Sequence, residues 1–147
     1  MRFQYCSSLE EVIITGLNIS RINQYCFSSC TKLKKVTLSS SVREIWDYSF
    51  DGCTSLAEIN LEYITTLRNY AFRGCSSLKH VSLPSLIEFV YNHQLIFSNM
   101  NSLESIDFGD KVLDFPEFTI NNAPKLTSLI FKEQVASFRN YSFSGMT

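Results

Sequence analysis

The chain has 147 residues, a formal net charge of −1, 45% hydrophobic residues and 18% charged residues. This length suits one domain, and the composition is that of a globular chain, too apolar for intrinsic disorder. The near-neutral charge argues against nucleic acid or an anionic membrane surface as the main partner, because both favour a basic excess. No run of about 18 apolar residues occurs, so the sequence predicts no membrane insertion.

A phrase of the form Phe–x–x–Cys–Ser/Thr–x–Leu returns along the whole chain. Its copies begin at Phe3, Phe27, Phe50 and Phe72, in weaker form at Phe97 and Ile120, and as a partial copy at Phe143. The strides are 24, 23, 22, 25, 23 and 23 residues. A fixed period of this size predicts stacked units that bury their apolar faces against one another. We therefore expect residues 1–147 to form one repeat domain.

Each repeat contains two apolar segments. The first, Leu–x–x–Val/Ile–x–Leu/Ile/Phe, ends in period-two alternation and predicts strands near 10–14, 34–38, 57–61, 79–83, 104–108 and 127–131. The second is a pair of mostly β-branched or aromatic residues three apart, which favours a short strand or bend. These pairs are Ile19/Ile22, Val42/Ile45, Ile64/Leu67, Leu86/Phe89, Val112/Phe115 and Val135/Phe138. Helix-capping patterns such as Ser7–x–x–Glu10 also occur, but a stride near 23 residues is too short for two helices.

The best copies are residues 50–56 and 69–78, which read Phe–Asp–Gly–Cys–Thr–Ser–Leu and Asn–Tyr–Ala–Phe–Arg–Gly–Cys–Ser–Ser–Leu. This pattern resembles the BspA-like leucine-rich repeats. The resemblance implies an α/β-type leucine-rich-repeat solenoid, mostly β, with about six repeats of 22–25 residues. It also implies a right-handed horseshoe or arc with a parallel sheet on the concave side. A parallel β-helix is the alternative fold.

Four of the five cysteines occupy one repeat position. Cys6, Cys30, Cys53 and Cys75 align with Met100, Ala123 and Met146 in the later repeats. An apolar slot filled by such different residues predicts an inward ladder of buried, free thiols. A metal site at Cys26 and Cys30 is the alternative, but neither a histidine nor a second cysteine pair has ligand spacing around them. No cofactor is predicted.

Outward positions of the first strands alternate in charge from repeat to repeat. Stacking would place Glu11 beside Lys35, Lys35 beside Glu58, and His80 between Glu58 and Ser105. Opposite charges on neighbouring strands stabilise a sheet, so one interpretation is a self-neutralising ladder. The other is a docking surface for a protein partner. Its candidate residues are Lys34, Lys35, Glu58, Lys79, His80 and Asp107.

A second candidate surface surrounds the single tryptophan. Trp46 occupies a position that varies between repeats, which predicts that it is exposed, beside Arg68. The fourth repeat is longer around Tyr91, and insertions in solenoids often form loops on a binding face. Exposed tryptophan and arginine are enriched in binding hot spots. A local cation–π contact is the competing interpretation.

Enzymatic motifs are poor, and we predict no catalysis. Ser76–x–x–Lys79 matches one element of the penicillin-binding serine enzymes, but its Ser–Asp–Asn and Lys–Thr–Gly partners are absent. Five glycines form no phosphate-binding loop. The sequence thus favours a non-catalytic scaffold for protein–protein interaction, and the family resemblance adds a possible role in adhesion.

Self-association is the alternative function. The repeats run to both termini without an atypical polar repeat, so the end repeats are expected to present apolar cross-sections. We expect a homo-oligomer, most simply a dimer through the aromatic-rich C-terminal end. The candidate residues are Ile14, Phe131, Phe138 and Phe143. No signal peptide precedes Phe3, which fits a cytoplasmic protein or an excerpt of a longer one, whereas the resemblance allows the cell surface.

Overall fold

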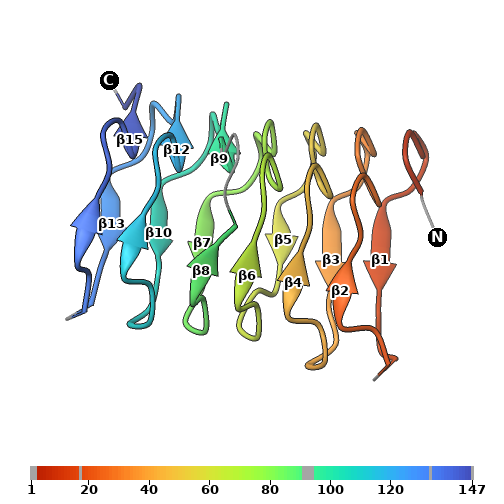
Figure 1. Ribbon diagram of the computed structural model, residues 1–147. Coiled ribbons are helices and arrows are strands. Elements are labelled where there is room, and N and C mark those ends of the chain that lie inside the picture. The colour runs from red at the N-terminus through yellow and green to blue at the C-terminus, as the bar shows by residue number, and fades with distance from the viewer. Residues whose placement is uncertain (1–2, 17, 91–94, 133, 147) are drawn as a thin grey trace.

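The structure is a computed structural model that describes residues 3–16, 18–90, 95–132 and 134–146. The chain winds into a stack of turns, with the first repeat at one end and the last at the other (Figure 1). Short strands joined by tight turns make up the described residues, and these contain no helix. They therefore include no helix that could cross a membrane. The mostly β solenoid is as predicted, with about one turn per repeat.

The first strand of each repeat lies inside the range that the sequence predicts. These strands are β1 (Glu11–Ile13), β3 (Lys35–Thr37), β5 (Glu58–Ile59), β7 (His80–Ser82), β10 (Ser105–Asp107) and β13 (Ser128–Ile130). All of their pairings are parallel and join equivalent residues, as Val12 with Val36 and Ile106 with Leu129. The predicted strands are confirmed, although each is only two or three residues long. The side chain at the centre of most of them points into the core.

The second apolar pair of each repeat also forms a short strand. These strands are β2 (Arg21–Ile22), β4 (Glu44–Ile45), β6 (Thr66–Leu67), β8 (Glu88–Phe89), β11 (Asp114–Phe115) and β14 (Ser137–Phe138). β2, β4, β6 and β8 form one parallel sheet, and β11 pairs separately with β14. The strand interpretation of these pairs is confirmed.

A third side of the stack was not predicted from the sequence. The later repeats add β9 (Phe97–Ser98), β12 (Ile120–Asn121) and β15 (Phe143–Ser144), which pair in parallel. The earlier repeats have turns there, yet their backbones still bond from turn to turn. Examples are the bonds from Phe3 N to Cys26 O (2.7 Å), from Phe50 N to Ala71 O (2.9 Å) and from Phe72 N to Ile96 O (3.1 Å). This side, which we call the spine, is therefore continuous.

The other two sides are each interrupted once among the described residues. No ladder joins β5 to β7, and none joins β8 to β11. On the opposite side of β5, which faces β3, the Asn60 side chain pairs with the backbone of the preceding repeat, because its amide oxygen accepts from Leu38 N (2.7 Å) and its amide nitrogen donates to Leu38 O (3.0 Å). An amide side chain that pairs like a peptide ends the strand early. We attribute the short β5 to this contact.

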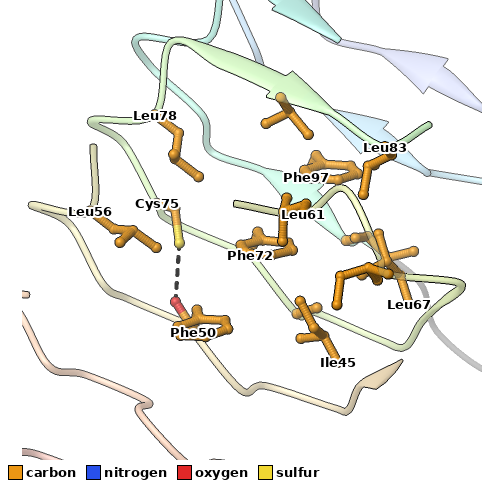
Figure 2. Packing of buried hydrophobic residues seen from close by; sticks show 14 of the residues in the cluster. Ile45, Phe50, Leu56, Leu61, Leu67, Phe72, Cys75, Leu78, Leu83 and Phe97 are labelled. Carbon is orange, nitrogen blue, oxygen red and sulfur yellow. Dashed lines mark hydrogen bonds between the residues drawn. The ribbon is translucent and has the colours of Figure 1, made fainter. Parts of the chain in front are cut away.

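The core is one continuous cluster in which equivalent residues stack (Figure 2). Rings of Phe3, Phe27, Phe50, Phe72 and Phe97 follow one another at centroid distances of 5.5–5.6 Å and interplanar angles of 1–12°. Such offset-stacked rings are a favourable aromatic geometry. The ring ladder ends where Ile120 replaces phenylalanine.

The thiol ladder lies beside the phenylalanines. Cys30, Cys53 and Cys75 are fully buried, and all five cysteines are free thiols. Each of these three thiols donates to the carbonyl of a phenylalanine in the preceding repeat, at 3.0–3.1 Å. Figure 2 shows the bond from Cys75 to Phe50. Cys6 is only half-buried, contrary to the prediction, because it lies in the outermost described turn.

Candidate binding surfaces

Ion pairs between neighbouring repeats cover the outward face of the first strands. Lys34 lies 2.9 Å from Glu10, and Lys35 lies 3.2 Å from Glu58. The hydrogen bond and charge of Lys34 lower the pKa of Glu10. Further along, Lys79 is 3.9 Å from Glu104. The predicted alternation of charge is thus present, and this face largely neutralises itself.

His80 lies at the gap in this sheet. Its Nδ1 is 2.9 Å from Ser105 Oγ, and its Nε2 is 3.8 Å from Glu104. The predicted contact with Ser105 is confirmed. On the other side, His80 and Glu58 line one open groove, but no strand ladder joins them, because β5 and β7 do not pair.

An open groove of about 480 Å³ lies along the same gap, and its lining includes Asn60, His80 and Asp107. The Asp107 carboxylate faces its own turn, where it accepts a hydrogen bond from Gly109 N at 2.8 Å. Asp107 is therefore committed to a structural contact. Within the described ranges, no group of three or more histidine, cysteine or acidic side chains could hold a metal ion.

The face of the second strands carries a stack of three side chains around the tryptophan. The Arg68 guanidinium carbon lies 4.2 Å from the centre of the Trp46 ring, and that of Arg21 lies 4.5 Å from it. Arg21 belongs to the preceding repeat and Arg68 to the following one, so the two cations cover opposite faces of the indole. The indole N–H donates to Glu44 Oε2 at 2.6 Å. We call Arg21, Trp46 and Arg68 the arginine–tryptophan stack.

The predicted neighbour Arg68 is confirmed, but Trp46 is half-buried instead of exposed, because a guanidinium covers each face. Arg21 was missed, since repeat alignment places Asn23 opposite Trp46. A search two residues either side of the aligned position would have found it. The remaining candidate on this side, Tyr91, lies outside the described residues.

Another arginine, Arg73, stacks on tyrosine rings. Tyr25, Tyr48 and Tyr70 stack at 4.8 and 4.6 Å, all with positive φ angles. The Arg73 guanidinium carbon lies 4.8 Å from the Tyr70 ring centre and 5.4 Å from that of Tyr48. Its Nε and terminal nitrogen both donate to the Asp51 carboxylate, at 2.7 and 2.8 Å. This hydrogen bond raises the pKa of Arg73.

The self-association candidates lie in the outer turns. Phe138 is 52% exposed, and Phe131, Phe143 and Ile14 are half-buried. The three phenylalanines contact one another at ring-centroid distances of 5.1–5.6 Å. In the first repeat an apolar groove of about 530 Å³ is lined by Ile14 and ten or so neighbours from Phe3 to Phe27. Both outer turns therefore present apolar side chains.

Comparison with solved structures relates the solenoid to three bacterial leucine-rich repeat proteins. One from Bacteroides ovatus has 22% identity over 90% of this chain, with a TM-score of 0.65. A leucine rich cell surface protein from Faecalibacterium prausnitzii has 23% identity over 82%, with a TM-score of 0.56. A Treponema pallidum leucine rich repeat protein has 25% identity over 86%, with a TM-score of 0.58.

The chain spans 40% of the length of the first of these proteins, 35% of the second and 72% of the third. No curated protein gives a significant match. The sequence does match the profile of the BspA type leucine rich repeat region, in six copies over residues 1–95 and 93–147. Leucine-rich repeat solenoids typically serve as protein-interaction scaffolds. On the profile match and the repeat geometry together, this chain belongs to the BspA-type leucine-rich repeat family.

Proposed function

We propose that this protein is a non-catalytic scaffold that binds a protein partner through the face of its second strands, centred on Trp46. The single observation that carries the choice of face is the pairing of charges. Lys34, Lys35 and Lys79 on the first-strand face each have a carboxylate of the neighbouring repeat. Arg21 and Arg68 form no ion pair with any described carboxylate.

Unpaired cations beside an aromatic ring favour binding for two reasons. Their charge remains available for a partner, and a tryptophan flanked by arginines has the composition of a hot spot. The first-strand face, whose charges neutralise one another, should bind a charged partner less favourably, because each new ionic contact must first displace an internal ion pair. The remaining candidates on the first-strand face, Glu58, His80 and Asp107, are also engaged with neighbours.

Affinity capture with matched variants tests this assignment. Bait protein carrying Trp46→Ala should lose a specifically captured partner, whereas Lys35→Glu with Lys79→Glu should retain it. Loss with the charge reversal and retention with Trp46→Ala would move the binding site to the first-strand face. An adhesive role, which the family resemblance implies, requires the captured protein to be a component of a cell surface, so its identification tests that role.

Self-association through the outer turns is our second proposal, and exposed apolar side chains support it. Phe138, Ile130 and Ile13 are 52%, 44% and 61% exposed. Exposed apolar side chains at the outer turns favour association. A C-terminal contact between two copies gives a closed two-fold dimer.

Light scattering tests the dimer. We expect a dimeric mass at micromolar concentration that Phe138→Glu converts to a monomeric one, whereas Ile14→Glu at the opposite end leaves the dimer intact. A monomeric mass for the unaltered protein, or a dimer that survives Phe138→Glu combined with Phe143→Glu, would exclude the C-terminal contact.

A further inference from the structure

Neither guanidinium of the arginine–tryptophan stack donates a hydrogen bond to another described residue. A guanidinium carries five N–H donors in its plane and none on its faces. Stacking against Trp46 occupies one face of each guanidinium and uses none of these donors. The Nε of Arg68 is buried and has no hydrogen-bond partner among the described residues. Buried donors are usually satisfied, and Arg68 as a whole is half-buried, so this guanidinium has hydrogen-bonding capacity that the described residues do not use.

Arg73 shows which acceptor fits the edge of a stacked guanidinium. Arg73 also stacks on aromatic rings, those of Tyr48 and Tyr70. Its edge is filled by the Asp51 carboxylate through two parallel hydrogen bonds of 2.7 and 2.8 Å. The two sites share a stacked guanidinium and differ in one respect. Arg73 has a carboxylate from its own chain, and Arg21 and Arg68 have none among the described residues.

Local charge favours the same acceptor. Two guanidinium groups flank one indole, each within 4.5 Å of the ring centre, so their positive charges repel. Glu44, the strand partner of Arg21, accepts a hydrogen bond from the indole N–H. One carboxylate beside two guanidiniums leaves an excess of positive charge. Additional carboxylates would cancel that excess.

We propose that the arginine–tryptophan stack binds an acidic peptide segment, with a carboxylate of the segment bonded to the edge of each guanidinium. The proposal rests on the proposed function and names the chemistry of its partner. Alternate residues of an extended peptide lie on the same side, about 6.6 Å apart, so acidic side chains two apart reach both arginines. An acidic peptide fits better than a polyanion such as heparin, because Glu44 beside the stack repels dense negative charge.

The site has a built-in reporter, because Trp46 is the only tryptophan of the chain. The probe is a blocked peptide that alternates glutamate with serine, and the control peptide has glutamine in place of glutamate. We expect a saturable change in tryptophan emission with the acidic peptide, weakened by added salt, and none with the control. Equal responses to both peptides, or no response, would overturn the proposal. So would a stronger response to heparin, which would indicate a polyanion site.

Variants assign the response to the two guanidiniums. Arg68→Gln should weaken binding by at least about tenfold, since a charge-assisted hydrogen bond is lost. Arg68→Lys should recover part of it, because lysine keeps the charge without the planar fork. Lys35→Gln, on the opposite sheet, should bind as the unaltered protein does. Unchanged affinity in the combined variant Arg21→Gln with Arg68→Gln would overturn the assignment, provided that its thermal unfolding shows a folded protein.

The two proposals fail in different ways. If partner capture depends on Trp46 but the acidic peptide does not bind, the peptide proposal is wrong and the scaffold assignment stands. If the peptide binds at the stack and capture is indifferent to Trp46→Ala, the binding chemistry stands and the functional assignment is wrong.

Discussion

In the first four repeats a cysteine follows the ladder phenylalanine by three residues, whereas Met100 and Ala123 stand there in the fifth and sixth. In the early repeats the carbonyl of Phe27 accepts from Cys30 N and from the Cys53 thiol, both at 3.1 Å. In the later repeats Met100 N and Ala123 N instead donate to the next turn, at 3.1 and 3.2 Å. Buried backbone groups need partners, and the two regions supply them differently.

The aromatic rings of the two regions also differ in their contacts. Rings at equivalent positions stack nearly parallel in both regions, as Phe50 on Phe72 at 6° and Phe108 on Phe131 at 8°. The later repeats also bring together rings from different repeat positions, which meet at steep angles, as Phe115 on Phe131 at 82°. The uniform early repeats form stacks of equivalent rings, and the later repeats add contacts between rings of different repeat positions. The comparison teaches that drift in a repeat motif can change local pairing while the solenoid continues.

The largest effect should come from removing a ring of the uniform stack. Phe72→Ala should lower the free energy of unfolding by about 3–5 kcal/mol, because this fully buried ring contacts rings on both sides. Phe138→Ala, at a half-exposed ring of the later cluster, should cost less than half as much. Urea unfolding of both variants measures the difference. Equal losses would mean that the two aromatic arrangements are equivalent.

A glycine in the later region should tolerate substitution less than one in the early region. Gly109 and Gly52 have φ angles of +70° and +71°, so alanine is strained at both. A Cβ at Gly109 would also approach Pro84 Cα at 2.8 Å, whereas the nearest atom at Gly52 is 3.6 Å away. We expect Gly109→Ala to cost roughly 2–3 kcal/mol and Gly52→Ala about 1 kcal/mol. Thermal unfolding that ranks them in the reverse order would contradict this packing.

The thiol-bearing region should weaken at alkaline pH. Burial raises the pKa of Cys53 to about 12, and it raises that of Cys75 as well. An unfolded thiol ionises near pH 9, so the stability that these neutral thiols contribute is full below pH 9. It is lost as the pH rises toward 12. At pH 10 we expect each of these two thiols to lower the free energy of unfolding by about 1–2 kcal/mol relative to neutral pH.

Urea unfolding at pH 7 and pH 10 measures this loss, and Cys53→Ala should show a smaller loss than the unaltered protein. Thiol reactivity gives a second measurement. In the unaltered protein, a thiol reagent at pH 9 should label the buried cysteines slowly, and labelling should accelerate on denaturation. Rapid native labelling of the buried thiols would refute the shift.

The smallest effect should come from the surface. Lys35→Gln removes an ion pair whose side chains are 50% and 68% exposed, so it should cost less than about 1 kcal/mol. If Lys35→Gln lowered the free energy of unfolding as much as Phe72→Ala does, surface ion pairs would contribute as much to the stability of the early region as its core does.

The period and the alternating apolar residues predicted the first and second strands of each repeat. These strands form where the repeat buries its own apolar side chains, and the sequence shows those side chains directly. The third strands escaped prediction, since Phe97–Ser98 and Phe72–Arg73 have similar local patterns and differ in the bonds made by the next turn. Likewise, nothing around Asn60 signals that its amide reaches Leu38, 22 residues away. For the candidate site, repeat alignment found Arg68 but not Arg21, because a long side chain can cross to a neighbouring position.

The gaps in the two sheets have a mechanical meaning. The first-strand sheet is interrupted between the third and fourth repeats, and the second-strand sheet between the fourth and fifth. The spine carries its hydrogen bonds past both gaps, as from Gly52 N to Arg73 O (2.8 Å) and from Gly74 N to Ser98 O (2.8 Å). A solenoid bends most easily where the hydrogen-bonded ladders on its other sides are interrupted and only one side remains continuous. Under tension we expect this solenoid to bend around its fourth repeat, where the two interrupted sides can separate while the spine stays hydrogen-bonded.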